Sequence, residues 1–126
     1  MSALVVDSSS WISYFAGRGS ELIEEALEEG RVYLPPIVAA ELCSGTFKTQ
    51  ERTRLFSFLS DLPMCGNDLG HWLRVGSLRA QARHKGLSVS TPDAHVAQCT
   101  LDLGGKLLTE DRIFHKLAKV CPLLMA

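Results

Sequence analysis

The sequence has no long hydrophobic run, and this absence excludes membrane-spanning proteins. No apolar stretch approaches the roughly 20 residues that a transmembrane helix needs. The opening run Ala3–Val6 follows only two residues, has no basic segment before it and stops at Asp7, so we do not expect a signal peptide. We therefore predict a cytoplasmic protein that makes no membrane contact.

Cysteines are few, and none belongs to a C-x-x-C pair. They lie far apart in segments otherwise typical of a core, which predicts reduced, buried thiols rather than disulfides: Cys43, Cys65, Cys99 and Cys121. The histidines show no spacing that pairs them as zinc ligands, so no zinc site is expected: His71, His84, His95 and His115. We interpret His95 as a structural or surface residue.

Three nucleotide and hydrolase motifs are also missing. There is no G-x-G-x-x-G, P-loop or G-x-S-x-G, which excludes the common dinucleotide, nucleoside triphosphate and serine-hydrolase sites. The chain has no internal repeat and no linker. Its 126 residues, 46% hydrophobic and 21% charged, predict one folded domain over residues 1–126. The net charge of −1 does not by itself indicate a nucleic-acid partner.

Short apolar segments alternate with amphipathic ones. Strands are expected at 3–7, 31–34 and 106–109, with brief further strands at 63–65 and 122–125. Helices are expected at 8–15, 20–29, 37–46, 49–62, 68–85, 92–103 and 111–119. In the helix at 68–85, the residues expected to face the core include Leu73, Leu78 and Ala82. This alternation predicts a three-layer α/β/α fold with a mostly parallel central sheet.

Four carboxylates lie where an apolar segment gives way to a turn or to the start of a helix, and one of them, Glu41, falls within the predicted helix. The four are Asp7, Glu41, Asp93 and Asp111. Strand ends and helix starts gather along one edge of an open α/β sheet, so these side chains are expected to share a cleft. At roughly 5 Å and an effective dielectric near 20, each ionised pair costs about 3 kcal/mol. Such a cluster needs trapped protons or hard divalent cations such as Mg²⁺ or Mn²⁺.

Each acid also has a simpler explanation. Thr91 and Thr109 are expected N-caps that place Asp93 and Asp111 at the second helical position, where an acid stabilises the helix dipole by about 0.3–1 kcal/mol. Glu41 interrupts an apolar helix, but it can point to solvent. Asp102 lies nine residues after Asp93, half a rotation around the helix, and is expected to face water.

The chain resembles the PIN-domain nucleases, and more narrowly the VapC-type toxins of type II toxin-antitoxin pairs. The resemblance spans nearly all 126 residues and is carried by four elements in order. These are a strand running into VVDSSSWI, a helix in PIVAAELCSG, the segment STPDAHVAQCTLDLGGKLLTEDRIF, and a hydrophobic end of the chain. The order and context of the acids, rather than any single motif, make the resemblance specific.

This resemblance implies an endoribonuclease that depends on Mg²⁺ or Mn²⁺, forms a homodimer and is inhibited by a cognate antitoxin. It implies that the metal-binding and catalytic acids are Asp7, Glu41, Asp93 and Asp111, with Ser9 and Thr109 as polar supports. Many relatives have another acid two residues after the position of Asp111, where this chain has Ile113. This departure leaves the number of bound metal ions open.

Two other functions remain open at this stage: a nuclease that matures RNA, and a catalytically weak module that binds RNA or protein. Basic residues on the helices at 49–62 and 68–85 either contact RNA phosphates or form a solvated face. They are Lys48, Arg52, Arg54, Arg74, Arg79, Arg83, His84 and Lys85. The aromatic group Trp11, Tyr14 and Phe15 belongs either to the core or to a partner surface.

Overall fold

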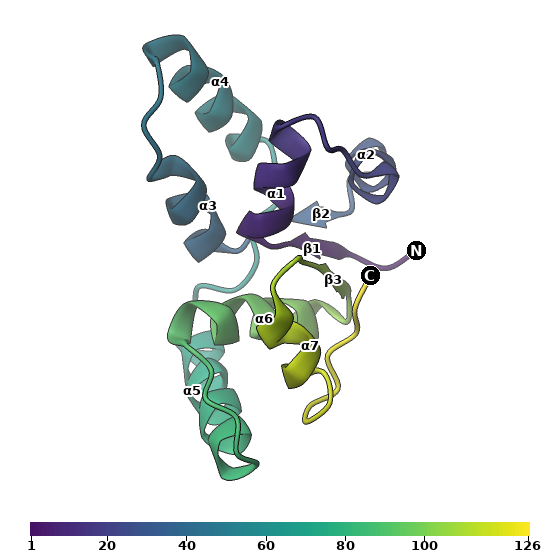
Figure 1. Ribbon diagram of the computed structural model, residues 1–126, viewed down its shortest axis with the longest axis vertical. Helices are drawn as coiled ribbons and strands as arrows, with labels where there is room; N and C mark the ends of the chain where they lie inside the picture. Colours follow the sequence, from purple (N-terminus) through teal and green to yellow (C-terminus); the bar gives the residue numbers. More distant parts are fainter.

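The computed structural model describes residues 1–126, and its strands form a three-stranded parallel sheet in the order β2-β1-β3 (Figure 1). The strands are β1 (Leu4–Val6), β2 (Val32–Tyr33) and β3 (Lys106–Leu108). Leu4 of the central strand aligns with Val32 on one side and Lys106 on the other. All three β1 residues are buried, as expected for a parallel strand covered on both faces. The predicted parallel sheet is confirmed.

Seven helices surround this sheet: α1 (Ser8–Phe15), α2 (Glu21–Glu28), α3 (Pro36–Cys43), α4 (Thr49–Ser60), α5 (Leu69–His84), α6 (Thr91–Leu103) and α7 (Arg112–Leu117). In Figure 1, α1, α3 and α4 lie on one side of the strands, and α5, α6 and α7 lie on the other. The predicted three-layer α/β/α fold is confirmed. None of the helices combines the length and the apolar character required to cross a bilayer.

Helix α2 shows how local sequence sets the boundaries of an element. The Ser20 hydroxyl accepts a hydrogen bond from the Leu22 amide at 3.2 Å, which caps the helix. Gly30 follows the helix with φ of 68°, a left-handed conformation that costs glycine little. Ile23 and Ala26 are buried, whereas Leu22 is 49% exposed, so the buried stripe of α2 is narrow.

Two predicted strands are reduced to single bridges. The segment 63–65 contributes only a bridge between Leu34 and Met64, and 122–125 contributes only one between Leu107 and Met125. Both backbone groups of Leu107 bond to the C-terminal segment: the amide donates to the Leu124 carbonyl at 2.9 Å, and the carbonyl accepts from the Ala126 amide at 2.8 Å. Both segments begin with a proline, which has no amide hydrogen to donate to a ladder. They therefore extend the sheet without forming strands.

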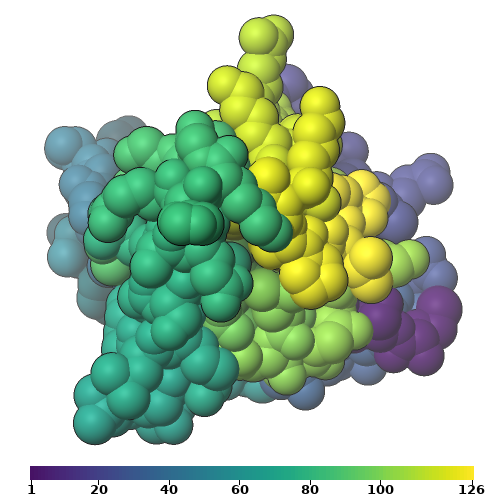
Figure 2. Space-filling model, turned by 90° about the horizontal axis from the view of Figure 1, so that it is seen from below, coloured from purple at the N-terminus to yellow at the C-terminus, as the bar shows by residue number.

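Helix α5 packs along α6, and one of its buried positions is the polar His71, which the sequence pattern did not reveal. His71, Val75, Leu78 and Ala82 are its buried residues, at helical spacing. Leu73, predicted to face the core, is 63% exposed because it lies off this stripe. In Figure 2, the green end of α5 and the yellow C-terminal segment lie side by side, and Lys85 Nζ donates to the Val120 carbonyl at 2.8 Å.

Candidate active site at the ends of the strands

Asp7 directly follows the central strand and is the N-cap residue of α1. Asp7 is only 5% exposed. Its carboxylate Oδ2 accepts a hydrogen bond from the Thr109 hydroxyl at 2.9 Å and another from the Ser9 hydroxyl at 3.3 Å. These two residues, predicted as polar supports, hold the carboxylate of the acid that ends β1.

The turn after β3 is tied to the same place. Thr109 Oγ1 accepts from the Asp111 amide, and Ser9 Oγ accepts from the Glu110 amide, both at 3.0 Å. Asp111 is itself the N-cap of α7, because its carboxylate accepts from the Ile113 amide at 3.2 Å. The prediction of Thr109 as cap and Asp111 as second helical residue was wrong, since the Thr109 hydroxyl is turned toward Asp7.

Asp93 lies in the first turn of α6. Ser90, rather than Thr91, is the N-cap, and its hydroxyl accepts from the Asp93 amide at 3.3 Å. Asp93 is therefore the third helical residue instead of the predicted second. Its side chain is half-buried and lies close enough to Asp111 and Asp7 to be repelled by their charges.

The four predicted acids are brought together at this edge of the sheet. Burial raises the pKa of Asp7, and repulsion from Asp111 raises it further, against the lowering effect of the hydrogen bonds from Thr109 and Ser9. Burial also raises the pKa of Asp93, with Asp111 and Asp7 adding repulsion. The pKa of the Glu41 carboxyl is raised by burial and then by Asp7 and Asp93, although Glu41 lies on the exposed side of α3.

No cation of the chain neutralises this cluster. The ion pairs of the structure lie elsewhere: Arg31 pairs with Glu29, and Arg74 pairs with Asp102, whose carboxylate also lies 3.2 Å from His71 Nδ1. Carboxylates that repel one another without a basic partner provide the oxygen ligands that hard divalent cations prefer. The site is therefore chemically suited to bind a cation and, through it, a phosphate.

The basic residues of α5 are mostly committed to contacts within the protein. Arg74 forms two hydrogen bonds with the Asp102 carboxylate, at 3.1 and 3.0 Å. Arg79 donates to the Val89 carbonyl at 2.8 Å, and Lys85 contacts Val120 as described above. These contacts favour a structural role for much of this helix face.

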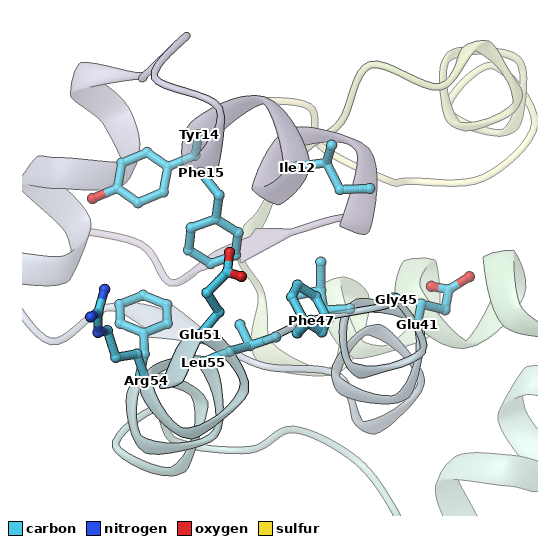
Figure 3. Close-up of a pocket in the computed structure, with 11 residues that line it drawn as sticks. Ile12, Tyr14, Phe15, Glu41, Gly45, Phe47, Glu51, Arg54 and Leu55 are labelled. Carbon is cyan, nitrogen blue, oxygen red and sulfur yellow. The ribbon is translucent and has the colours of Figure 1, made fainter. Parts of the chain in front are cut away.

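An apolar groove begins beside Glu41 and runs between α1, α3 and α4 (Figure 3). Its volume is about 720 Å³. Ile12 and Phe15 line it and are 57% and 47% exposed, whereas Trp11 is fully buried. The aromatic group of α1 is thus divided between the core and an open surface.

A second cluster of chemically active side chains was missed by sequence reasoning. His71 Nε2 lies 2.6 Å from His95 Nδ1, and Cys99 Sγ lies 3.8 Å from His95 Nε2. Burial, assisted by the neighbouring His71, lowers the pKa of His95 to about 4. His95 is structural, as one of the two interpretations held. Asp102, expected only to face water, accepts hydrogen bonds from Arg74 and Gln98 and lies 3.2 Å from His71 Nδ1. The only sequence signal was the i, i+4 spacing of His95 and Cys99.

Comparison with known proteins identifies the family to which the fold belongs. The chain is 27% identical to the VapC ribonuclease Mb1587 of Mycobacterium bovis and to ribonuclease VapC11 of Mycobacterium tuberculosis, over 98% of this chain and 97% of each relative. Its fold is similar to that of DNA-bound VapBC from Salmonella typhimurium, with a TM-score of 0.78 and 21% identity over 100% of this chain and 98% of the other. VapBC2 from Rickettsia felis, bound to a promoter DNA fragment, gives a TM-score of 0.77 at 18% identity, covering 98% and 97%. The PIN domain model matches residues 4–120, and the chain belongs to the PIN domain family.

Proposed function

We propose that this protein is a metal-dependent endoribonuclease that hydrolyses RNA phosphodiester bonds and acts as the toxin of a toxin-antitoxin pair. The observation that carries the proposal is the convergence of four carboxylates at one sheet edge without a basic partner, where burial and mutual repulsion raise the pKa of Asp7, Glu41 and Asp93. Membership of the PIN domain family and similarity to named VapC ribonucleases supply the reaction class. An RNA substrate would place the protein in the cytoplasm.

The donor set fits Mg²⁺ or Mn²⁺, because it consists of carboxylates and hydroxyls without a sulfur or imidazole ligand. In our proposal Asp7 and Asp93 hold the principal ion, and Asp111 completes its shell directly or through water. When bound, the cation lowers the pKa of a water molecule and neutralises the charge of the scissile phosphate. With Ile113 where many relatives have an acid, the chain itself offers four carboxylates and no fifth at this place.

The remaining chemistry belongs to residues of the chain. The Thr109 and Ser9 hydroxyls fix Asp7 Oδ2, so the carboxylate does not have to reorganise when substrate arrives. Glu41 comes from a different element, α3, and its pKa is raised above the ordinary value. We assign it the role of positioning the attacking water and accepting its proton, since a base with a raised pKa is better matched to neutral pH.

A toxin requires a partner that blocks it, and the groove beside Glu41 is suited to this. It offers exposed apolar side chains and is lined by Glu41, so an antitoxin segment bound in the groove would also cover this acid. We propose that the cognate antitoxin occupies this groove, and that the protein forms a homodimer through another surface.

The decisive experiment compares RNA cleavage by the intact protein and by Asp7→Asn and Asp93→Asn. Both substitutions preserve size and remove one ligand charge, so we expect cleavage to fall by roughly 10²- to 10⁴-fold while the fold is kept. Asp61→Asn, at the exposed C-cap of α4, is the matched control and should cleave normally. Cleavage should also require added Mg²⁺ or Mn²⁺.

Full activity of Asp7→Asn, or activity in excess EDTA, would exclude the proposed mechanism. If the intact protein cleaves RNA and Asp7→Asn does not, sequencing of RNA ends after brief expression of both forms identifies the substrate. Binding of RNA by all forms, without cleavage by any, would favour a binding module instead.

A further inference from the structure

The buried cluster between α5 and α6 contains a donor set different from that of the acidic site. The donor atoms of His71, His95 and Cys99 all lie within 4.8 Å of one another. All three residues are 0% exposed. The thiol of Cys65, a residue only 5% exposed, lies close enough to the Cys99 thiol to raise its pKa, so Cys65 can supply a second sulfur beside this group.

Three separate segments contribute these side chains. His95 and Cys99 are one turn apart on α6, so they lie on the same face. His71 comes from the first turn of α5, and Cys65 from the loop before it. Gly66 keeps this loop close, because a Cβ atom there would lie 2.5 Å from His71 Nδ1. The cluster thus joins α5 and its preceding loop to α6.

A carboxylate orients the first imidazole of the cluster. Asp102 lies 3.2 Å from His71 Nδ1, and is itself held by Arg74 and Gln98, so His71 directs its Nε2 inward. Metal-binding histidines are commonly oriented in this way by a carboxylate on their second nitrogen. Trp72 stacks on His95 with 4.6 Å between ring centroids, which shields that side of the cluster.

We propose that Cys65, His71, His95 and Cys99 form a structural site for Zn²⁺ or a similar borderline-soft divalent metal. Two sulfurs and two imidazole nitrogens are a typical tetrahedral zinc donor set. Binding would release the two thiol protons to solvent, and the two thiolates would then balance the dication, which a buried site requires. The His71 Nε2 to His95 Nδ1 distance would widen from 2.6 Å to about 3.3 Å.

This site is separate from the acidic one and does not depend on the ribonuclease function. His95 lies two residues after Asp93, about 200° around the helix, so the two side chains leave α6 on different sides. The competing explanation is a metal-free chain of hydrogen bonds from the Cys99 thiol through His95 and His71 to Asp102. That chain accounts for His71, His95 and Cys99, but it leaves the buried Cys65 thiol near Cys99 without a role.

The test uses Co²⁺ as a probe in the full-length Asp7→Asn protein, which disables the acidic site. We expect one Co²⁺ per chain with the visible absorption of tetrahedral cobalt and a sulfur-to-cobalt charge-transfer band, both removed by one equivalent of Zn²⁺. Cys65→Ser and Cys99→Ser, each added to Asp7→Asn, should lose the charge-transfer intensity. Cys121→Ser, which alters a thiol outside the cluster, should keep it. Asp102→Asn should keep the band but weaken Zn²⁺ binding by about 10- to 100-fold.

Thermal melting supplies the second readout. Zn²⁺ should raise the melting temperature of Asp7→Asn and leave that of the Cys99→Ser form unchanged, while the metal-free melting temperatures of the two stay close because serine keeps a hydrogen-bonding group. Absence of a cobalt–thiolate band in Asp7→Asn, or an equal band after Cys99→Ser, would overturn the proposal and assign the residues to the metal-free hydrogen-bond chain.

Discussion

The acidic cluster at the sheet edge and the histidine–cysteine cluster between α5 and α6 differ in solvent exposure and in whether their side chains repel or bind one another. At the sheet edge, Asp7 is buried, Asp93 is half-buried, and Glu41 and Asp111 are exposed, so ions and substrate can reach repelling charges. Between the helices, His71, His95 and Cys99 are fully buried and pair with one another. The repulsion within the first cluster therefore lowers the stability of the fold, whereas the contacts within the second contribute to it.

The largest expected effect is on the stabilising side of this comparison. His95→Ala removes a buried imidazole, leaves a cavity and deprives His71 Nε2 of its partner at 2.6 Å. We expect the free energy of unfolding to fall by about 3 kcal/mol. Asp93→Ala, two residues earlier, should change it by less than about 1 kcal/mol, because it removes a repelled charge. Urea unfolding of the metal-free proteins measures both, and equal losses would remove the contrast.

The next effect concerns how the acidic cluster is held. Thr109→Val keeps the shape of the side chain but removes the hydroxyl that donates to Asp7 Oδ2 and accepts from the Asp111 amide. RNA cleavage should fall by about 10- to 100-fold. Ser9→Ala should cost less, since its contact with Asp7 is longer, 3.3 Å against 2.9 Å. Thr109→Ser restores the hydroxyl and should restore activity; if it remains as impaired as Thr109→Val, packing rather than the hydrogen bond is what matters.

The difference between the two clusters also explains what the sequence was able to predict. Asp7 follows an apolar strand and Asp111 follows another, so the parallel topology alone predicts that they meet. The predicted helices exist because amphipathic spacing and glycine or proline boundaries are local signals. The exact caps were harder: Ser90 and Asp111 act as N-caps in place of the predicted threonines, and such choices depend on contacts with other segments.

The histidine–cysteine cluster depends on which face of α5 meets α6, and no local pattern determines that. A polar His71 occupies a core position, so hydrophobic periodicity selected the exposed Leu73 instead. His71 and His95 are 24 residues apart, and their pairing arises from the packing of two helices. Tertiary contacts of this kind are beyond single-sequence periodicity.

A smaller effect tests whether the acidic cluster destabilises the fold. The folded-state pKa of Asp7 is raised above its ordinary value of 3.8, so the unfolded chain ionises first as pH rises through 3.8. The resulting penalty is absent below that pH, grows until the folded-state pKa is passed, and is constant above it. In EDTA, Asp7→Asn should therefore be more stable than the intact protein at pH 7.

This advantage should disappear as pH falls toward 3.8, where both forms are uncharged at this position. Paired thermal melts at several pH values measure it, and the pH-independent part of the difference reports any packing change. A constant advantage, or greater stability of the intact protein at pH 7, would show that the Asp7 charge is not strained in the metal-free fold.

The smallest expected effect lies on the groove, which combines exposed apolar side chains with Glu41 of the acidic cluster. Ile12→Ser alters a residue that is 57% exposed, so the stability of the free protein should change by no more than about 0.5 kcal/mol. If an antitoxin covers the groove, the same change should weaken its binding about fivefold, because the lost apolar contact is worth about 1 kcal/mol. Leu73→Ser is the matched control, since Leu73 is 63% exposed on α5, outside the groove. Calorimetric titration with the cognate antitoxin distinguishes the two variants, and equal affinities for both would place the antitoxin on another face.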